Sequence, residues 1–162
     1  MKNYLPIKVL SIICMALRIA SLLTVIVCIT FQKQIVTIYM SESIAEEVGF
    51  FVPRMLLAEA IIAAGFAIAL FILTNKLNGK SLIIVSIAFA VALVLRTATS
   101  GITGQAELAL TYRLLDQYQI AAYSSLTSAA GLFTAPLNGV AAACYYMICG
   151  MGIVLGIRER QV

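Results

Sequence analysis

Four long apolar segments dominate the chain of 162 residues and leave little of it for any other kind of structure. These segments are residues 7–31, 54–74, 81–99 and 128–157. A helix needs about 20 residues to cross a bilayer, because each residue adds roughly 1.5 Å along the helix axis. The sequence therefore predicts four transmembrane helices in a single domain, joined by two longer loops at 32–53 and 100–127.

Composition favours a lipid environment over a soluble fold. Hydrophobic residues make up 62% of the chain and charged residues 11%, whereas a soluble domain averages roughly 45–50% and about 25%. A short soluble domain buries only about two-thirds of the surface that unfolding exposes, so it cannot hide this much apolar surface from water. We therefore expect an all-α integral membrane protein: a four-helix bundle in the cell membrane, which is the inner (cytoplasmic) membrane if the source is bacterial.

Charged residues outside the spans predict the orientation of the bundle. Six basic residues fall on one predicted side: Lys2, Lys8, Lys76, Lys80, Arg158 and Arg160. The two longer loops carry most of the acidic residues, which are Glu42, Glu46, Glu47, Glu107 and Asp116. Because basic residues concentrate in cytoplasmic loops, both termini and the 75–80 turn are expected in the cytoplasm, with two helical hairpins whose long loops are external.

The two external loops are themselves expected to contain short helices. Residues 105–123 alternate apolar and polar positions with helical spacing, which predicts an amphipathic helix lying in the membrane interface between the third and fourth spans. A helix that recognises a partner or a lipid is the alternative for this segment. In the first loop, Ser43 and Glu46 fit a capping box that opens a short helix, and Gly49 is placed to end it.

Three ionisable residues lie inside the predicted spans: Arg18, Glu59 and Arg96. Such residues are rare in membranes and usually face the bundle interior or a water-filled cavity. Counting residues from the ends of the predicted spans places Glu59 at the same depth in the membrane as Arg96, and Arg18 at the same depth as Asn138. One interpretation is a buried Glu59–Arg96 ion pair, with Arg18 held by Asn138 or by backbone carbonyls. The other is a polar cavity open to the outside that binds an anionic group such as a carboxylate or a phosphate.

Small residues in the fourth segment predict close helix packing. Gly152 and Gly156 form a GxxxG motif, and Gly139 with Ala143 has the same spacing. This spacing lets two helices approach closely in lipid, either within one chain or between chains. Pro136 is expected to bend the same helix.

The sequence also argues against several kinds of chemistry. It contains no histidine, which argues against His-ligated haem, most zinc sites and the usual general base. Its four cysteines include no C-x-x-C pair of the kind that quinone-linked thiol enzymes use. There is no basic face with interleaved aromatic residues, which argues against nucleic-acid binding. We therefore predict no metal, no cofactor and no catalytic residue.

Two functions remain after these exclusions. The first is a non-enzymatic membrane subunit or accessory protein that packs against a partner membrane protein or against itself. The second is a small transporter or binding protein that holds an anionic small molecule at Arg18, Glu59, Arg96 and Asn138.

Overall fold

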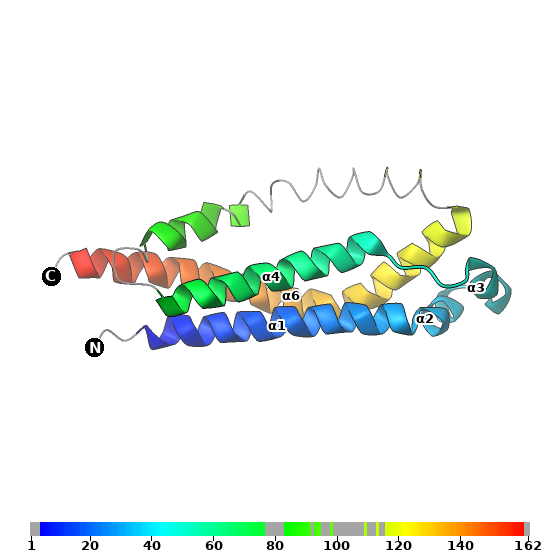
Figure 1. Ribbon diagram of the computed structural model, residues 1–162, viewed down its shortest axis with the longest axis horizontal. Helices are drawn as coiled ribbons and strands as arrows, with labels where there is room; N and C mark the ends of the chain where they lie inside the picture. The colour runs from blue at the N-terminus through cyan, green and yellow to red at the C-terminus, as the bar shows by residue number, and fades with distance from the viewer. Residues whose placement is uncertain are drawn as a thin grey trace.

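The computed structural model is helical in the part of the protein that it describes, without a strand there (Figure 1). The helices are α1 (Leu5–Thr30), α2 (Gln32–Tyr39), α3 (Glu42–Val48), α4 (Arg54–Lys76) and α6 (Gln117–Arg160). The described residues are 4–76, 83–91 and 116–160, with the single positions 93, 94, 98, 109 and 113.

Among the described residues, three helices are long and apolar enough to cross a membrane: α1, α4 and α6. The ends of α1 and α4 fall within two residues of the predicted segments 7–31 and 54–74. Of the third predicted segment, 81–99, residues 83–91 are described and are helical, while much of the remainder lies outside the described residues. The membrane-protein class is thus supported by the long apolar helices, and the count of four spans stays a prediction.

Helix α1 packs against both α4 and α6 (Figure 1). Along α1 and α6, Arg18 bonds to Asn138 and Cys14 to Ala141, so residue numbers rise on α6 as they fall on α1. These two helices are therefore antiparallel. The first residues of α1 and the last residues of α6 lie at the same end of the bundle in Figure 1.

The main core lies where α1, α4, α6 and the 83–91 segment meet. Its buried members are Ile7, Cys14, Leu70, Phe89, Ala141, Cys144, Tyr145, Ile148 and Cys149. Phe66 joins α4 to this core, because its ring lies 5.1 Å from the Phe89 ring and 5.8 Å from the Tyr145 ring. Near Ser11 the contact between α1 and α4 is polar, because the Thr74 hydroxyl donates to the Ser11 hydroxyl at 3.1 Å.

Helix α6 begins at Gln117, eleven residues earlier than the predicted span 128–157. The polar residues before 128 suggested a loop, but their hydroxyls fold back onto the helix. Ser125 donates to the Ala121 carbonyl at 2.9 Å and Thr127 to the Ser124 carbonyl at 2.9 Å. This local bonding removes the need for water around these side chains and lets the helix continue.

The segment predicted to form an interfacial amphipathic helix, 105–123, is therefore only partly observable. Residues 117–123 belong to α6, and most of the preceding residues lie outside the described part of the chain. Pro136 lies inside α6, and Figure 1 shows α6 changing direction in its yellow-to-orange stretch. Proline lacks the amide hydrogen that would bond one turn back, which accounts for a bend there.

The loop predicted at 32–53 contains two short helices, α2 and α3, which pack on the beginning of α6. Val36, Ala45, Ala122 and Leu126 form a second buried cluster between them. The predicted capping box is misplaced by two residues, because Ser41 rather than Ser43 precedes the helix. Gly49 ends α3 as expected, with a φ of 63° that favours glycine.

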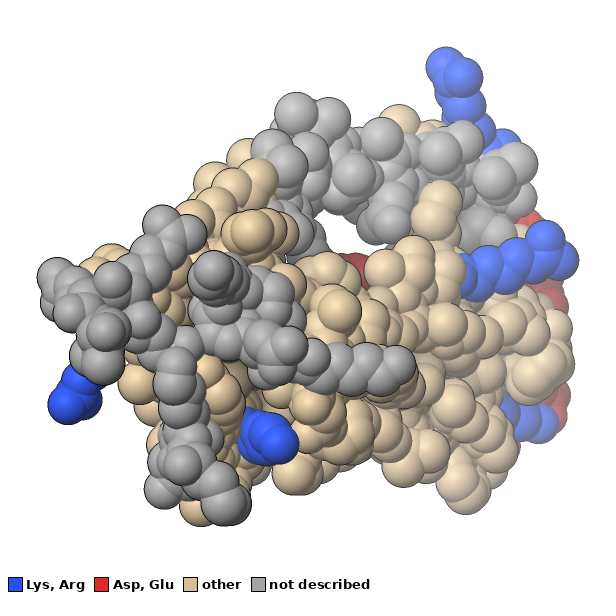
Figure 2. Space-filling view, turned by 60° about the vertical axis from the view of Figure 1, so that its left-hand side comes forward, with Lys and Arg blue, Asp and Glu red and all other residues tan. Residues whose placement is uncertain are grey.

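The described acidic side chains are unevenly distributed along the bundle, whereas the basic ones are not. In Figure 2 blue basic side chains appear both at the end that comes forward and at the far end, while the red acidic side chains visible on this face lie away from the near end. Lys8 and Arg158 belong to the near end, and Lys33, Glu46 and Arg54 to the far end. The placement of the acidic side chains agrees with the charge asymmetry of the sequence.

Candidate functional site

Arg18 on α1 lies against Asn138 and Tyr145 of α6. These two residues are seven positions apart, so they lie on the same face of α6. The Arg18 Nη1 donates to Asn138 Oδ1 at 2.6 Å. Its guanidinium carbon lies 5.9 Å from the centroid of the Tyr145 ring, within the range of a cation–π contact. The predicted contact between Arg18 and Asn138 is therefore present, and Tyr145 is an additional neighbour that the sequence did not indicate.

Both of these partners of Arg18 are neutral. The Arg18 Nε is buried and has no hydrogen-bond acceptor in the described part of the protein. An isolated charge at mid-membrane costs roughly 2.5–3.5 kcal/mol or more, so partial solvation by an amide oxygen and an aromatic face leaves the charge incompletely compensated. The arrangement gives the bundle a positive centre near the middle of α1.

Closely packed residues enclose this centre on its inner side. The Cys14 thiol donates to the Ala141 carbonyl at 3.7 Å, and both residues are fully buried. All four cysteines are free and buried, as packing residues would be. The Tyr145 side chain is 2% exposed. No group of three or more metal-ligating side chains occurs within the described ranges.

Glu59 does not lie at the level of Arg18. It is exposed on α4, and the Ser11–Thr74 contact sets the register between α1 and α4. Counting seven residues along each helix from that contact places Arg18 opposite position 67 of α4. Glu59 is eight residues away from this position, which is about 12 Å along the helix axis. Arg96 lies outside the described residues. Of the four predicted site residues, the structure brings Arg18 and Asn138 together and places Glu59 at another depth.

The small residues of α6 fall into two groups with different surroundings. Gly152 and Gly156 are buried, and a Cβ atom at Gly156 would collide with Cγ1 of Ile83. Gly139 and Ala143 are exposed, and a Cβ atom at Gly139 would meet nothing within 4 Å. The GxxxG pair therefore serves packing within the chain, while the Gly139–Ala143 pair is not used by the described chain itself.

The exposed small residues belong to a continuous strip that we call the open face of α6. It consists of Leu132, Pro136, Gly139, Ala143, Gly150 and Val154. Successive members are three or four positions apart, except that seven positions separate Ala143 from Gly150, where exposed Met147 lies between them; all therefore lie along one side of the helix. At Gly150 the strip borders an apolar hollow of about 510 Å³, whose other walls are Pro6, Met147, Met151, Val154 and Leu155.

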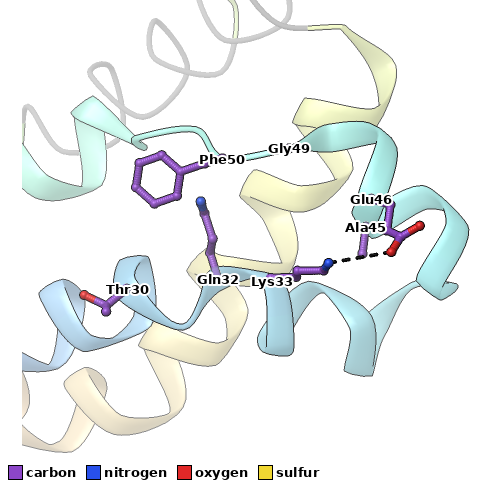
Figure 3. A pocket seen from close by; sticks show the side chains of 7 residues that line it. All are labelled: Thr30, Gln32, Lys33, Ala45, Glu46, Gly49 and Phe50. Atoms are coloured by element: carbon purple, nitrogen blue, oxygen red, sulfur yellow. Dashed lines mark ion pairs between the residues drawn. The ribbon is translucent and has the colours of Figure 1, made fainter.

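A second site, which the sequence did not indicate, lies at the opposite end of the bundle, between α2 and α3. Figure 3 shows this pocket of about 420 Å³, lined by Thr30, Gln32, Lys33, Ala45, Glu46, Gly49 and Phe50. Lys33 Nζ and Glu46 Oε1 face one another across its edge at 3.7 Å. The pocket thus presents one cation and one anion at one edge, while the Phe50 ring lies on the other side of Gln32 (Figure 3).

Gln32 fixes the wall of this pocket. Its side chain is 4% exposed and lies below the segment that joins α3 to α4 (Figure 3). With the amide oriented to satisfy both groups, Nε2 donates to the Phe51 carbonyl at 2.7 Å and Oε1 accepts from the Phe51 amide at 3.2 Å. A buried amide that satisfies a loop backbone in this way holds the loop against the end of α1.

Comparisons of the chain with protein-family models, with curated proteins and with solved structures find no match.

Proposed function

We propose that the protein is a non-enzymatic membrane subunit that associates with another membrane chain, or with a second copy of itself, through the open face of α6. In this role it would assist the transport, assembly or signalling activity of the complex. We further propose the four-span topology, with both termini in the cytoplasm and the α2–α3 end outside.

The observation that carries this proposal is the contrast between Gly156 and Gly139. Glycine in a membrane helix allows another helix to approach closely. Gly156 has such a neighbour in Ile83, whereas Gly139 and Gly150 have nothing within 4 Å. Larger side chains at these positions would bury more apolar surface in lipid at no steric cost within the chain. Small residues kept on an open face fit contact with a helix from another chain.

The test is to purify the full-length protein from its native membrane in mild detergent and measure its assembly state. Gly139→Ile should reduce the fraction in the larger complex about tenfold, as expected if a close contact is worth about 1.4 kcal/mol. Gly65→Ile is the matched control, because Gly65 also has nothing within 4 Å but lies among exposed isoleucines at positions 61, 62, 68 and 72, which already keep another helix from a close approach. Equal assembly in both variants, or a protein that is monomeric without any co-purifying chain, would contradict the proposal.

Arg18 supports a second candidate function, the binding of an anionic group within the membrane. The observation in its favour is that, among the described residues, the Arg18 guanidinium contacts the neutral side chains of Asn138 and Tyr145, while its buried Nε has no acceptor there. A carboxylate or phosphate group would complete its coordination, because guanidinium groups bind these anions through paired hydrogen bonds.

Asn138→Asp tests this second function, because it supplies a carboxylate to Arg18 from the chain itself. If the positive centre binds an external anion, the variant should lose stabilisation by inorganic phosphate or acetate in a thermal unfolding assay. Asn75→Asp is the control, since Asn75 is exposed and its amide bonds to the Phe71 carbonyl at 3.2 Å. An unmodified protein that neither anion stabilises would contradict anion binding by these groups.

A further inference from the structure

The pocket between α2 and α3 lies at the depth of lipid headgroups if α1 crosses the membrane. Helix α1 has 26 residues, which span about 39 Å at 1.5 Å each. The hydrocarbon core of a bilayer is about 30 Å thick, and the headgroups extend the total to about 40–45 Å. Lys33 follows the end of α1 by three positions, so its charge falls within the headgroup layer or just beyond it.

The charged pair at the pocket edge is loose. Lys33 Nζ and Glu46 Oε1 are 3.7 Å apart, and their side chains are 64% and 65% exposed. Charge-assisted hydrogen bonds between such groups are about 2.7–2.9 Å long. An exposed pair contributes only about 0–1 kcal/mol. Both groups therefore retain hydrogen-bonding capacity, and a ligand with one charge of each sign can insert between them at small cost.

One exposed apolar side chain, that of Phe50, lines the same pocket. Exposed Phe31 and Ile38 belong to the adjoining turns of the chain but do not line it. A second hollow of about 440 Å³, lined by Lys33, Gln34, Thr37 and Ile38, adjoins the first at Lys33. Lys33 therefore lines both the pocket and a shallower hollow beside it.

We propose that this pocket binds the headgroup of a phospholipid that carries both a phosphate and a primary ammonium group, as in phosphatidylethanolamine. The Lys33 ammonium donates to the phosphate oxygens, and the lipid ammonium donates to the Glu46 carboxylate. Phe50, which lines the pocket, contacts the upper part of the acyl chains. This proposal is independent of the open face of α6 and concerns a separate site.

The chemistry of the pair predicts selectivity among headgroups. A choline headgroup has a quaternary ammonium without an N–H donor, so it cannot form the hydrogen bond to Glu46. A glycerol headgroup has no cation, and its phosphate would be repelled by the unpaired Glu46 carboxylate. The pocket should therefore prefer an ethanolamine headgroup to either of them.

Lipid retention on the full-length protein tests the proposal. The protein is placed in vesicles with equal amounts of phosphatidylethanolamine, phosphatidylcholine and phosphatidylglycerol, then extracted gently, and the bound lipid is counted by native mass spectrometry. We expect phosphatidylethanolamine to be retained about tenfold over each of the others, which corresponds to about 1.4 kcal/mol. Glu46→Gln should abolish its preference over phosphatidylcholine. Lys33→Gln should lower retention of all three lipids.

Glu42→Gln is the matched control, because Glu42 is exposed on the same helix but does not line the pocket. Equal retention of the three lipids, or the same loss in Glu42→Gln as in Glu46→Gln, would overturn the proposal. Soluble glycerophosphoethanolamine separates the two sources of the same chemistry. It should not displace the lipid at equal concentration, because it lacks acyl chains. Full displacement would overturn the assignment to a lipid. Both Gln variants are expected to retain the helical circular dichroism of the unmodified protein.

Discussion

The two faces of α6 use similar residues for different purposes. The inner face carries Tyr145 and Gly156, both in contact with other helices of the chain. The outer face carries Gly139 and Ala143, which are exposed. The comparison shows that small-residue spacing indicates where a helix can be approached, but the identity of the neighbour depends on the fold. It also separates residues needed for folding from residues available for association.

The largest expected effect distinguishes two adjacent tyrosines. Tyr145→Ala should lower the free energy of unfolding by about 3–5 kcal/mol, because it removes a buried aromatic side chain and leaves a cavity. Tyr146→Ala should change it much less, since the Tyr146 side chain is 56% exposed. The measurement is an SDS titration in mixed micelles followed by circular dichroism. Equal losses would mean that the two faces of α6 are not distinct.

An intermediate effect is expected at the polar contact between α1 and α6. Asn138→Leu should cost about 1.5–3 kcal/mol, the usual value for a hydrogen bond to a charged group. The double variant Arg18→Met with Asn138→Leu should recover part of this loss, because no charge then remains to be solvated. The same titration measures both. A double variant less stable than Asn138→Leu alone would show that Arg18 stabilises the bundle through other contacts.

A smaller effect is expected from the two kinds of glycine. Gly156→Ala should destabilise the bundle by about 1–3 kcal/mol, because its new methyl group collides with Ile83. Gly150→Ala should change the free energy of unfolding by no more than about 0.5 kcal/mol, since its methyl group meets nothing within 4 Å. The double variant Gly156→Ala with Ile83→Ala should relieve the collision, because the side chain at position 83 is then shorter. If Gly150→Ala were the more harmful single change, the assignment of the two faces would be reversed.

The sequence predicted the parts of this fold that depend on local hydrophobicity. The ends of α1 and α4 followed from their apolar runs, and depth counting placed Arg18 level with Asn138. The sequence predicted an amphipathic helix over 105–123 separate from a span that begins at 128, whereas α6 continues without a break from Gln117. The hydroxyls of Ser125 and Thr127 bond to their own helix and make this polar stretch compatible with helix continuation.

Contacts between segments were much harder to predict. Gln32 is the first residue of α2 and Phe51 follows α3, and nothing in their spacing shows that the Gln32 side chain satisfies the Phe51 backbone. The Lys33–Glu46 pair was hard to predict for the same reason, because it forms only when α3 folds back on α2. Likewise, the spacing of Gly139 and Gly156 could not show which of them already has a neighbour in the chain.

In situ photo-crosslinking tests the central claim, that α6 offers its outer face to another chain, most directly. A diazirine-bearing residue is placed at position 143 in the open face, and separately at position 65 on the exposed side of α4, in cells that carry the full-length protein in their own membrane. We predict that position 143 yields a protein adduct, either of two copies or with a second chain, while position 65 yields lipid adducts. Lipid adducts alone at both positions would contradict association of another chain with the open face of α6.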